Sequence, residues 1–340
     1  GAPRTSGWRA EGREEATVPD NSPREVLPHF DPHDPGLSPE RAYATYAQLR
    51  RHCPVSHGER HGGYWSISRY ADVRDAASSQ DDLHIWWLGQ SGFLVQWRGS
   101  HLLFDPYLSD SLSRKYAATD KPHTRMTGLV ISPDALDFID LTTSSHNHTD
   151  HLDGETLTAL MQANPEMELL VPSANLRFAA ERLDVDPDQL EAIDAGQSIA
   201  LGPFEIHAVP AAHEDLAKDD LGRHQYVGYV AKLGPWTIYH SGDTIPYDGM
   251  EEILLQWKID VALLPINGRR PERRVAGNLW GHEAANLAKA IGVRMVIPCH
   301  YDMFEFNTET PEEFETTCQA LGQAHQTIRA GQRWSSFGLK

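Results

Sequence analysis

The residues with the clearest chemical meaning lie in one short segment, 145–154, which reads SHNHTDHLDG. It follows a short apolar run that we expect to be a strand. Histidines two positions apart on an extended strand end point the same way, so His146 and His148 can bind one metal ion. Asp150 and His151 then lie on the turn into a helix, where they can face a second ion. A lone histidine is usually a surface or core residue, but this density of donors indicates a metal site.

Two ions need more ligands than this segment supplies, and the later sequence offers three. Each lies just past an apolar run that we expect to be a strand: His213 in VPAAHED, Asp243 in YHSGDT and His300 in IPCHYD. Loops that follow strand ends can bring residues from distant parts of a chain to one edge of a sheet. We therefore expect these three side chains to join the first group.

Imidazole and carboxylate ligands without a thiolate suit zinc, manganese or iron, and we expect two divalent ions per chain, zinc or manganese. A water between them would lose its proton near neutral pH, because binding to a metal lowers its pKa from 15.7 to roughly 7. It would then attack a carbonyl or phosphoryl group that one ion polarises. Asp150 is either a ligand or the catalytic base that passes the proton to the leaving group.

The elements that position these residues follow a regular order. Short apolar runs bounded by turn residues predict strands at 84–88, 92–97, 101–104, 138–143, 168–172, 204–209, 226–233, 236–240, 260–264 and 294–298. Helical patterns occur at 154–162, 174–183, 249–257, 282–291 and 311–320. The last begins with Thr310 as the expected N-cap, Pro311 in the first helical position and Glu313 to complete a capping box. Strand runs followed by helices repeat in two halves, which predicts an α/β fold with two sheets between helices.

The composition is that of a soluble globular protein with an acidic surface. Thirty Lys and Arg against 48 Asp and Glu give a formal net charge of −18 over 340 residues, which disfavours binding to nucleic acid or to an anionic membrane. Three cysteines are too few and too scattered for a disulfide framework or a cysteine-based zinc site. No apolar run is long enough to span a membrane, and the start lacks a signal-peptide pattern. We expect a cytoplasmic protein, and a homo-oligomer stays open.

The N-terminal part differs from the rest. Prolines recur between residues 19 and 39, which precludes a regular helix, so we expect residues 1–40 to be a mobile linker. A helix-like run follows from Ser38, and 63–68 alternates like a strand. These pieces are too small to bury a core of their own, so we assign the catalytic domain to residues 82–340.

Residues 30–80 contain runs such as AQLR, CPV and GYWSISRYADV. They resemble the N-terminal end of bacterial cytochromes P450. The helices that carry haem in that family are missing here, and so is its cysteine ligand loop. We therefore interpret residues 41–81 as a fused fragment without a haem site.

The set HxHxDH at 146–151 together with His213, Asp243 and His300 resembles the metallo-β-lactamase superfamily of binuclear hydrolases. Four further runs, IWWLG (85–89), DPY (105–107), YHSGD (239–243) and VIPCHYD (296–302), are similar to its L-ascorbate-6-phosphate lactonase-like branch. The resemblance spans residues 83–340 and implies an αββα sandwich with the metals at one edge. It also implies the ligand sets: His146, His148 and His213 on the first ion, Asp150, His151 and His300 on the second, and Asp243 bridging.

Residues that bind the substrate are expected in the loop after 260–264, where arginines stand at 269, 270, 273 and 274. Guanidinium groups bind phosphate or carboxylate through paired hydrogen bonds, so Arg269 and Arg270 can hold an anionic group. A solvated loop paired with acids is the alternative. Asn278, His282 and Tyr301 are further substrate-binding candidates, each with an ordinary capping, surface or core role as its alternative.

Together these features predict a metal-dependent hydrolase in which a metal-bound hydroxide attacks a small, anionic lactone, ester or phosphodiester. β-Lactam hydrolysis with the same ligands is one alternative. A metal-stabilised scaffold that recruits a partner without turnover is another. Nuclease activity is disfavoured by the acidic charge. Dioxygen chemistry, as in the di-iron relatives, is disfavoured because His148 stands where those proteins place a glutamate.

Overall fold

The computed structural model describes residue 38 and residues 55–58, 64–67, 81–337 and 339. The chain divides into two compact units, residues 1–68 and 69–340. In the first unit, strands β1 (Val55–Gly58) and β2 (Tyr64–Ile67) form an antiparallel pair, which confirms the strand expected at 63–68. Apart from these positions and residue 38, the expected linker, the helix-like run and the P450-like fragment lie outside the described residues.

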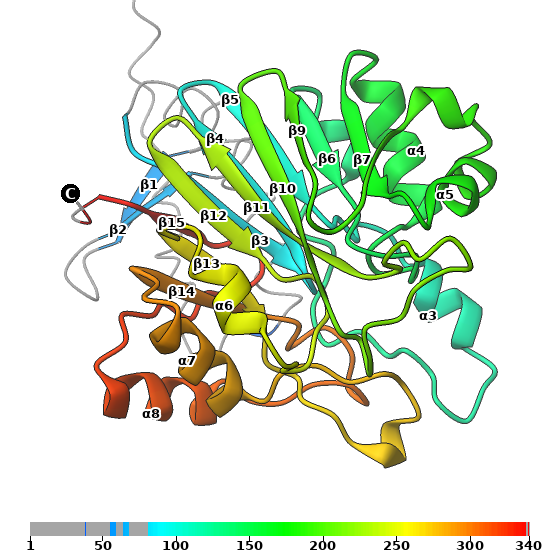
Figure 1. Cartoon of the computed structure of the whole chain (residues 1–340). Helices are drawn as coiled ribbons and strands as arrows, with labels where there is room; N and C mark the ends of the chain where they lie inside the picture. The colour runs from blue at the N-terminus through cyan, green and yellow to red at the C-terminus, as the bar shows by residue number, and fades with distance from the viewer. Residues whose placement is uncertain (1–37, 39–54, 59–63, 68–80, 338, 340) are drawn as a thin grey trace, which may run out of the picture. The chain divides into compact units, whose positions relative to one another are not determined.

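The second unit is built on two sheets that lie face to face (Figure 1). The first sheet has seven strands in the order β15-β3-β4-β5-β6-β7-β8. In chain order these are β3 (His84–Gly89), β4 (Gly92–Trp97), β5 (Ser100–Phe104), β6 (Leu141–Thr143), β7 (Glu168–Pro172), β8 (Glu191–Ile193) and β15 (Arg333–Ser335). β3, β4 and β5 are antiparallel neighbours joined by short turns, whereas β5 to β8 pair in parallel and need longer crossover connections.

The second sheet has six strands in the order β14-β13-β12-β11-β10-β9. In chain order these are β9 (Ser198–Leu201), β10 (Phe204–Pro210), β11 (Val227–Leu233), β12 (Trp236–His240), β13 (Val261–Pro265) and β14 (Met295–Cys299). The last three pair in parallel. Their carboxyl ends therefore reach the same edge of the sheet.

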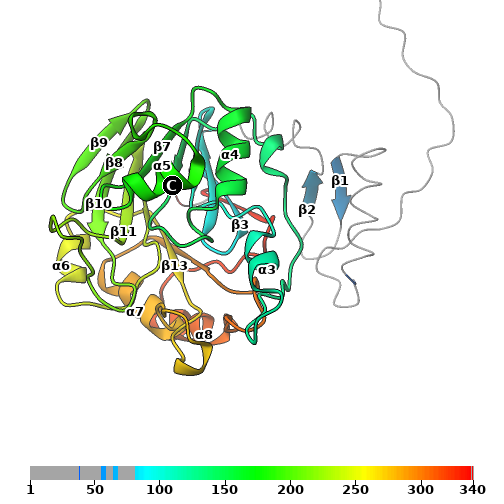
Figure 2. The same cartoon turned by 90° about the vertical axis from the view of Figure 1, so that its right-hand side faces the viewer.

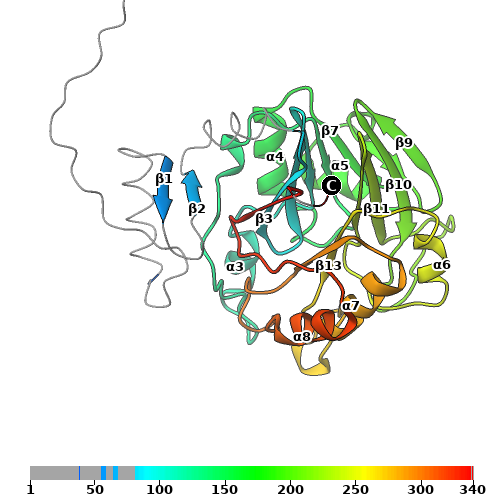
Figure 3. The ribbon, with the colours of Figure 1, turned by 90° about the vertical axis from the view of Figure 1, so that its left-hand side faces the viewer.

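Helices cover the outer sides of the two sheets. They are α3 (Ser111–Tyr116), α4 (Gly154–Ala163), α5 (Leu176–Leu183), α6 (Met250–Leu254), α7 (Gly281–Ala290) and α8 (Glu312–Leu321), with 3-10 turns at Pro133–Ala135, Pro187–Gln189 and Pro271–Arg273. Figures 2 and 3 show α4 and α5 on the side of the first sheet and α6, α7 and α8 on the other side. Within the described ranges, no helix combines the length and the apolar character needed to cross a membrane.

Alternation along the central strands explains these layers. Ile85, Phe93 and Phe104 belong to the core between the sheets. Leu94 and Leu103 belong to a separate apolar cluster under α4 and α5. Successive side chains of a strand point to opposite faces, so a strand covered on both sides is apolar on both. The result is the expected αββα sandwich.

Several element boundaries differ from the sequence-based expectation by a few residues. β6 begins at Leu141 rather than at residue 138, and the residue before it, Asp140, accepts a hydrogen bond on its carboxylate from the backbone N–H of His101 (2.7 Å). The capping box expected at the start of α8 was wrong. Pro311 occupies the N-cap position without a side-chain hydrogen bond, and the Glu313 carboxylate binds α7 instead.

Candidate metal centre

The carboxyl ends of β5, β6, β12 and β14 meet at one edge of the sandwich, and the loop after β6 lies there. Ser144 Oγ donates to the carbonyl oxygen of His146 (2.8 Å). Arg182 of α5 donates to the carbonyl oxygens of Asn147 and Leu152 (3.0 and 2.9 Å). These bonds fix the backbone of the loop, so the directions of its histidine and aspartate side chains are fixed as well.

Three histidines form what we call the first subsite: His146, His148 and His213. Their ligand nitrogens lie within 4.8 Å of one another, and their ring centroids are 4.6 to 5.2 Å apart. His213 comes from the loop after β10. His146 and His213 are buried, whereas His148 is exposed. The first subsite therefore opens to solvent on the His148 side.

Asp150, His151 and His300 form what we call the second subsite. Their ligand atoms also lie within 4.8 Å of one another. Asp150 Oδ2 is 3.7 Å from the Nε2 atoms of both His151 and His300. The two histidines are buried and the aspartate is half-buried. This subsite differs from the first in containing a carboxylate and in being closed to solvent.

Asp243 lies between the two subsites. Its Oδ1 is 3.3 Å from His151 Nε2, and its Oδ2 is 3.2 Å from His300 Nε2 and 3.6 Å from His213 Nε2. It follows Gly242, whose φ is +59° and where a Cβ would lie 2.7 Å from a side chain of the loop after β6. Only glycine combines that backbone with that clearance. The turn that aims Asp243 between the subsites therefore depends on it.

Two of the histidine rings, those of His146 and His151, have polar partners at Nδ1, which leaves their Nε2 atoms facing the other ligands. His151 Nδ1 donates to the Asp105 carboxylate (2.7 Å), and His146 Nδ1 lies 3.0 Å from the hydroxyl of Ser145. The Nε2 atoms of His146 and His151 are buried, and neither makes a hydrogen bond to a described residue. Buried polar atoms nearly always have a partner. These nitrogens, with oxygen ligands beside them, therefore fit bound cations.

The two subsites differ in charge. Burial lowers the pKa of all three histidines of the first subsite, that of His213 to about 4, so these imidazoles are neutral at neutral pH. Burial opposes the charge of His151 too, but Asp243 and Asp150 outweigh it and hold its pKa well above the usual range. For Asp243 itself, burial is outweighed by His300 and His151, and its pKa is well below the usual range.

Comparison with known proteins places this centre in a family. A family model described as a beta-lactamase superfamily domain matches residues 84–300. A UPF0173 metal-dependent hydrolase of Myxococcus xanthus is 31% identical over 245 residues, which are 70% of this chain and 77% of the relative. The chain belongs to the UPF0173 metal-dependent hydrolase family of the metallo-β-lactamase superfamily.

Two further proteins are similar to the chain, one in sequence and one in fold. A UPF0173 metal-dependent hydrolase of Pyrobaculum aerophilum is 28% identical over 243 residues, 71% of this chain and 94% of the relative. Igni18, a metallo hydrolase from the archaeon Ignicoccus hospitalis, has the same fold with a TM-score of 0.54 and 20% identity, over 75% of this chain and 98% of that one. The expected superfamily is thus confirmed. The lactonase-like branch and the P450 resemblance stay predictions.

Two residues that the sequence analysis missed lie against the ligands of this UPF0173 chain. The ring of Tyr226 packs with its centroid 5.3 Å from that of His146 and 5.4 Å from that of His213. Gln90, in the turn between β3 and β4, has its Nε2 2.8 Å from Asp150 Oδ2. Neither residue type is a typical metal ligand, and both are far from the histidine segment in sequence. A position in a tight turn beside a glycine was the one available signal for Gln90.

The arginines predicted to bind substrate have acidic partners. Arg269 binds Glu283 through two hydrogen bonds of 2.6 Å. Arg270 pairs with Glu309 at 2.6 Å. The two other arginines of the loop are also ion-paired. The guanidinium groups of this loop are therefore already engaged by carboxylates, and their role in substrate binding stays a prediction.

The three other substrate candidates also have partners within the protein. Asn278 is buried and donates to Asn267 Oδ1 (3.0 Å). His282 is exposed, with its Nδ1 3.0 Å from Glu313 Oε1. Tyr301 is buried in the core, where its hydroxyl donates to a backbone carbonyl oxygen. Their roles in substrate binding stay predictions too.

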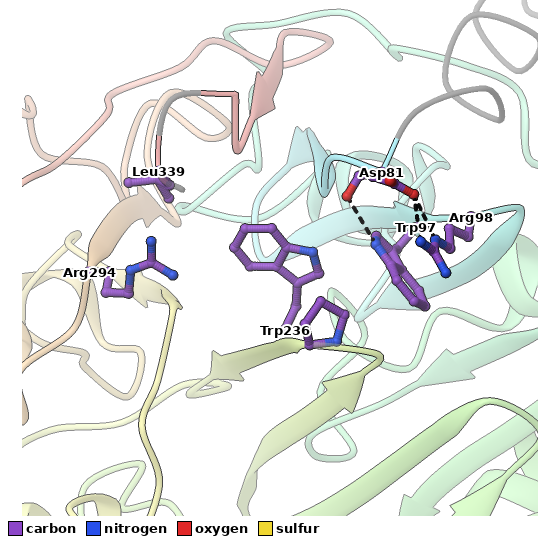
Figure 4. Close-up of a pocket in the computed structure, with 7 residues that line it drawn as sticks. Asp81, Trp97, Arg98, Trp236, Arg294 and Leu339 are labelled. Carbon is purple, nitrogen blue, oxygen red and sulfur yellow. Dashed lines mark hydrogen bonds and ion pairs between the residues drawn. The ribbon is translucent and has the colours of Figure 1, made fainter.

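A pocket of about 350 Å³ lies where β4 ends and β12 begins, at the edge of the sandwich away from the candidate ligands (Figure 4). It is lined by Asp81, Trp97, Arg98, Pro235, Trp236, Arg294 and Leu339. Arg98 pairs with Asp81 at 2.7 Å and Arg294 with Asp260 at 2.8 Å. None of the seven candidate ligands lines it. The pocket is therefore separate from the candidate metal centre of this superfamily member.

Proposed function

We propose that this chain is a binuclear hydrolase that uses an activated water to attack a small lactone, ester or phosphodiester. The observation that supports this best is the convergence of the two subsites on Asp243, which lies within 3.2 to 3.6 Å of a histidine nitrogen from each. Divalent cations in such a centre lower the pKa of a bound water to roughly 7. This supplies a nucleophile at neutral pH.

Each candidate ligand has a defined part in this proposal. His146, His148 and His213 hold the first cation, Asp150, His151 and His300 hold the second, and Asp243 is shared. Nitrogen and oxygen donors without a thiolate favour zinc or manganese. The histidines of the second subsite lower the pKa of Asp150 despite its burial. Its carboxylate is therefore ionised at neutral pH and can accept a proton during the reaction.

The proposed substrate class is supported by fewer observations than the proposed metal ligands. The runs IWWLG, DPY, YHSGD and VIPCHYD support a lactonase-like activity, and the arginine loop is the argument for an anionic substrate. Since Arg269 and Arg270 already bind Glu283 and Glu309, an anionic group would have to compete with these carboxylates. We therefore place lactones and carboxylic esters first and phosphodiesters second.

We assign the activity to residues 82–340, because all seven candidate ligands lie between His146 and His300 in the chain. The direct test is metal analysis of the purified protein, followed by a screen of lactones, esters, phosphodiesters and β-lactams with the metal-stripped protein as control. We expect metal-dependent hydrolysis of a lactone or ester. Hydrolysis of β-lactams alone would favour the alternative activity.

The variant His148→Ala tests the ligand assignment. Because His148 is the exposed member of the first subsite, we expect its loss to remove most bound metal and hydrolysis together without unfolding the chain. His207→Ala is a matched control, since His207 lies on β10 and pairs with Glu205 at 2.7 Å. A His148→Ala protein with full metal content and full rate would show that the ligand assignment is wrong.

A further inference from the structure

The turn between β3 and β4 has an unusual backbone at Gln90. Its φ is +50°, in the left-handed region that residues other than glycine seldom adopt. Its carbonyl oxygen accepts hydrogen bonds from the indole N–H of Trp87 (2.8 Å) and from the backbone N–H of His300 (2.9 Å). Unfavourable backbone conformations persist where the surroundings impose them, and they cluster at functional sites. The conformation of Gln90 is thus held from two directions.

This backbone turns the side chain of Gln90 into the second subsite. Its Nε2 donates to Asp150 Oδ2 at 2.8 Å and lies 3.0 Å from His300 Nε2. The residue is 2% exposed. A single turn residue therefore binds one ligand through its side chain and contacts another through both its side chain and its backbone.

Ser91, the next residue in the turn, contacts the strand end and the loop that carry Asp243. The carbonyl oxygen of Ser91 accepts from His240 Nε2 (2.8 Å), and its hydroxyl lies 3.5 Å from Asp243 Oδ1. His240 is the last residue of β12, which leads directly into the loop that carries Asp243. The turn therefore contacts both candidate carboxylate ligands, Asp150 and Asp243.

We propose that Gln90 is a positioning residue of the second subsite, a role that rests on the function proposed above. Its carboxamide fixes the direction of the Asp150 carboxylate. Its carbonyl oxygen holds the backbone that presents His300. A carboxamide is neutral at every pH, so it can restrain a carboxylate beside a cation without the repulsion that a lysine or arginine would add. Among the described residues, its carboxamide contacts only ligands of the second subsite, so its effect is confined to that subsite.

The test measures the binding of Zn²⁺ and of Mn²⁺ to the metal-stripped protein. Calorimetry gives the affinities, and metal analysis after dialysis gives the number of cations that stay bound. Gln90→Met keeps the length of the side chain and removes the donor. Residues that orient metal ligands change metal affinity by about 10- to 100-fold when mutated. We expect a loss of that size at the second subsite and no change at the first.

Gln90→Asn distinguishes the effect of the side chain from that of the backbone conformation. Asparagine tolerates a positive φ, but its shorter side chain withdraws the amide donor from Asp150. We expect the same selective loss in this variant. Gln326→Met removes an exposed amide that, among the described residues, donates to the carbonyl oxygen of Thr327, and this variant should bind both cations as the unmodified chain does.

The outcomes are distinct. Unchanged affinity at both subsites in Gln90→Met overturns the proposal. An equal loss at both subsites, or an Asn variant with full affinity, overturns it as well, since either result assigns the effect to the fold of the turn. If the unmodified chain itself binds fewer than two cations, the binuclear function fails, and this outcome is separate from any difference between the variants.

Discussion

The two subsites sit side by side but are built differently. The first consists of three neutral imidazoles, and one of them, His148, is exposed. The second combines a carboxylate with two buried histidines, of which His151 has a raised pKa. The comparison indicates that the two positions are not equivalent in access to solvent or in proton balance.

The rings of the two subsites are also supported differently. His151 is held by the Asp105 carboxylate at 2.7 Å, with both residues fully buried. The Nδ1 atom of His213 instead lies 3.1 Å from a neutral partner, the backbone carbonyl oxygen of Gly277. A charged partner behind a ligating histidine raises its basicity and fixes its orientation. We therefore expect the second subsite to bind a proton or a cation more strongly, and the neutral histidines of the first subsite to release no proton when a cation binds.

The largest expected effect comes from the residue that the two subsites share. Asp243→Ala removes oxygens that lie 3.2 to 3.6 Å from nitrogens of both. Since residues behind the ligands already change affinity by about 10- to 100-fold, we expect more than about 100-fold weaker binding at each subsite and loss of hydrolysis. Calorimetry and metal analysis measure this, with the exposed Asp215→Ala as control. Retention of one cation at full affinity would show that Asp243 serves one subsite only.

Much of the fold could be predicted from the sequence, because the strands are short apolar runs bounded by glycine-containing turns. β3, β4, β7 and β12 begin where the runs begin. The start of β6 was predicted too early, and the residue before it, Asp140, bonds to His101, which is 39 residues away in the chain. The start of α8 failed for a similar reason, because Glu313 pairs with His282 of α7.

The candidate centre shows the same limit. The spacing in 146–151 brings donors together through local geometry alone, so it can be recognised from sequence. Gln90 reaches Asp150 and His300 across 60 and 210 residues, and nothing in its type marks it. The arginine loop is compatible with binding an anion or an acidic side chain. Only the fold places carboxylates against these arginines.

Proton release provides a smaller but selective test of the comparison. The pKa of His151 is raised, so at neutral pH it carries a proton that a cation must displace. Binding at the second subsite should release about one proton and weaken by about tenfold for each unit that the pH falls. The pKa values of the histidines in the first subsite are lowered, that of His213 to about 4, so these rings are neutral at neutral pH. Binding there should release almost none.

Calorimetry in buffers with different heats of ionisation measures the two proton counts separately. Equal proton release in both binding steps would contradict the difference between the subsites.

The smallest effect is expected from deletion of residues 1–75. All candidate ligands of both subsites lie between His146 and His300, and the two main apolar clusters of the sandwich begin at Leu83 and Leu88. We therefore expect the truncated chain to keep its cation affinities and its kcat/KM, with thermal unfolding as the control for folding. A folded truncation that loses hydrolysis but keeps both cations would show that the N-terminal unit shapes the substrate site. Weaker binding at the first subsite alone would show instead that the N-terminal unit affects the subsite in which His148 is exposed. The exposure of that subsite would then be a property of residues 69–340 and not of the whole chain.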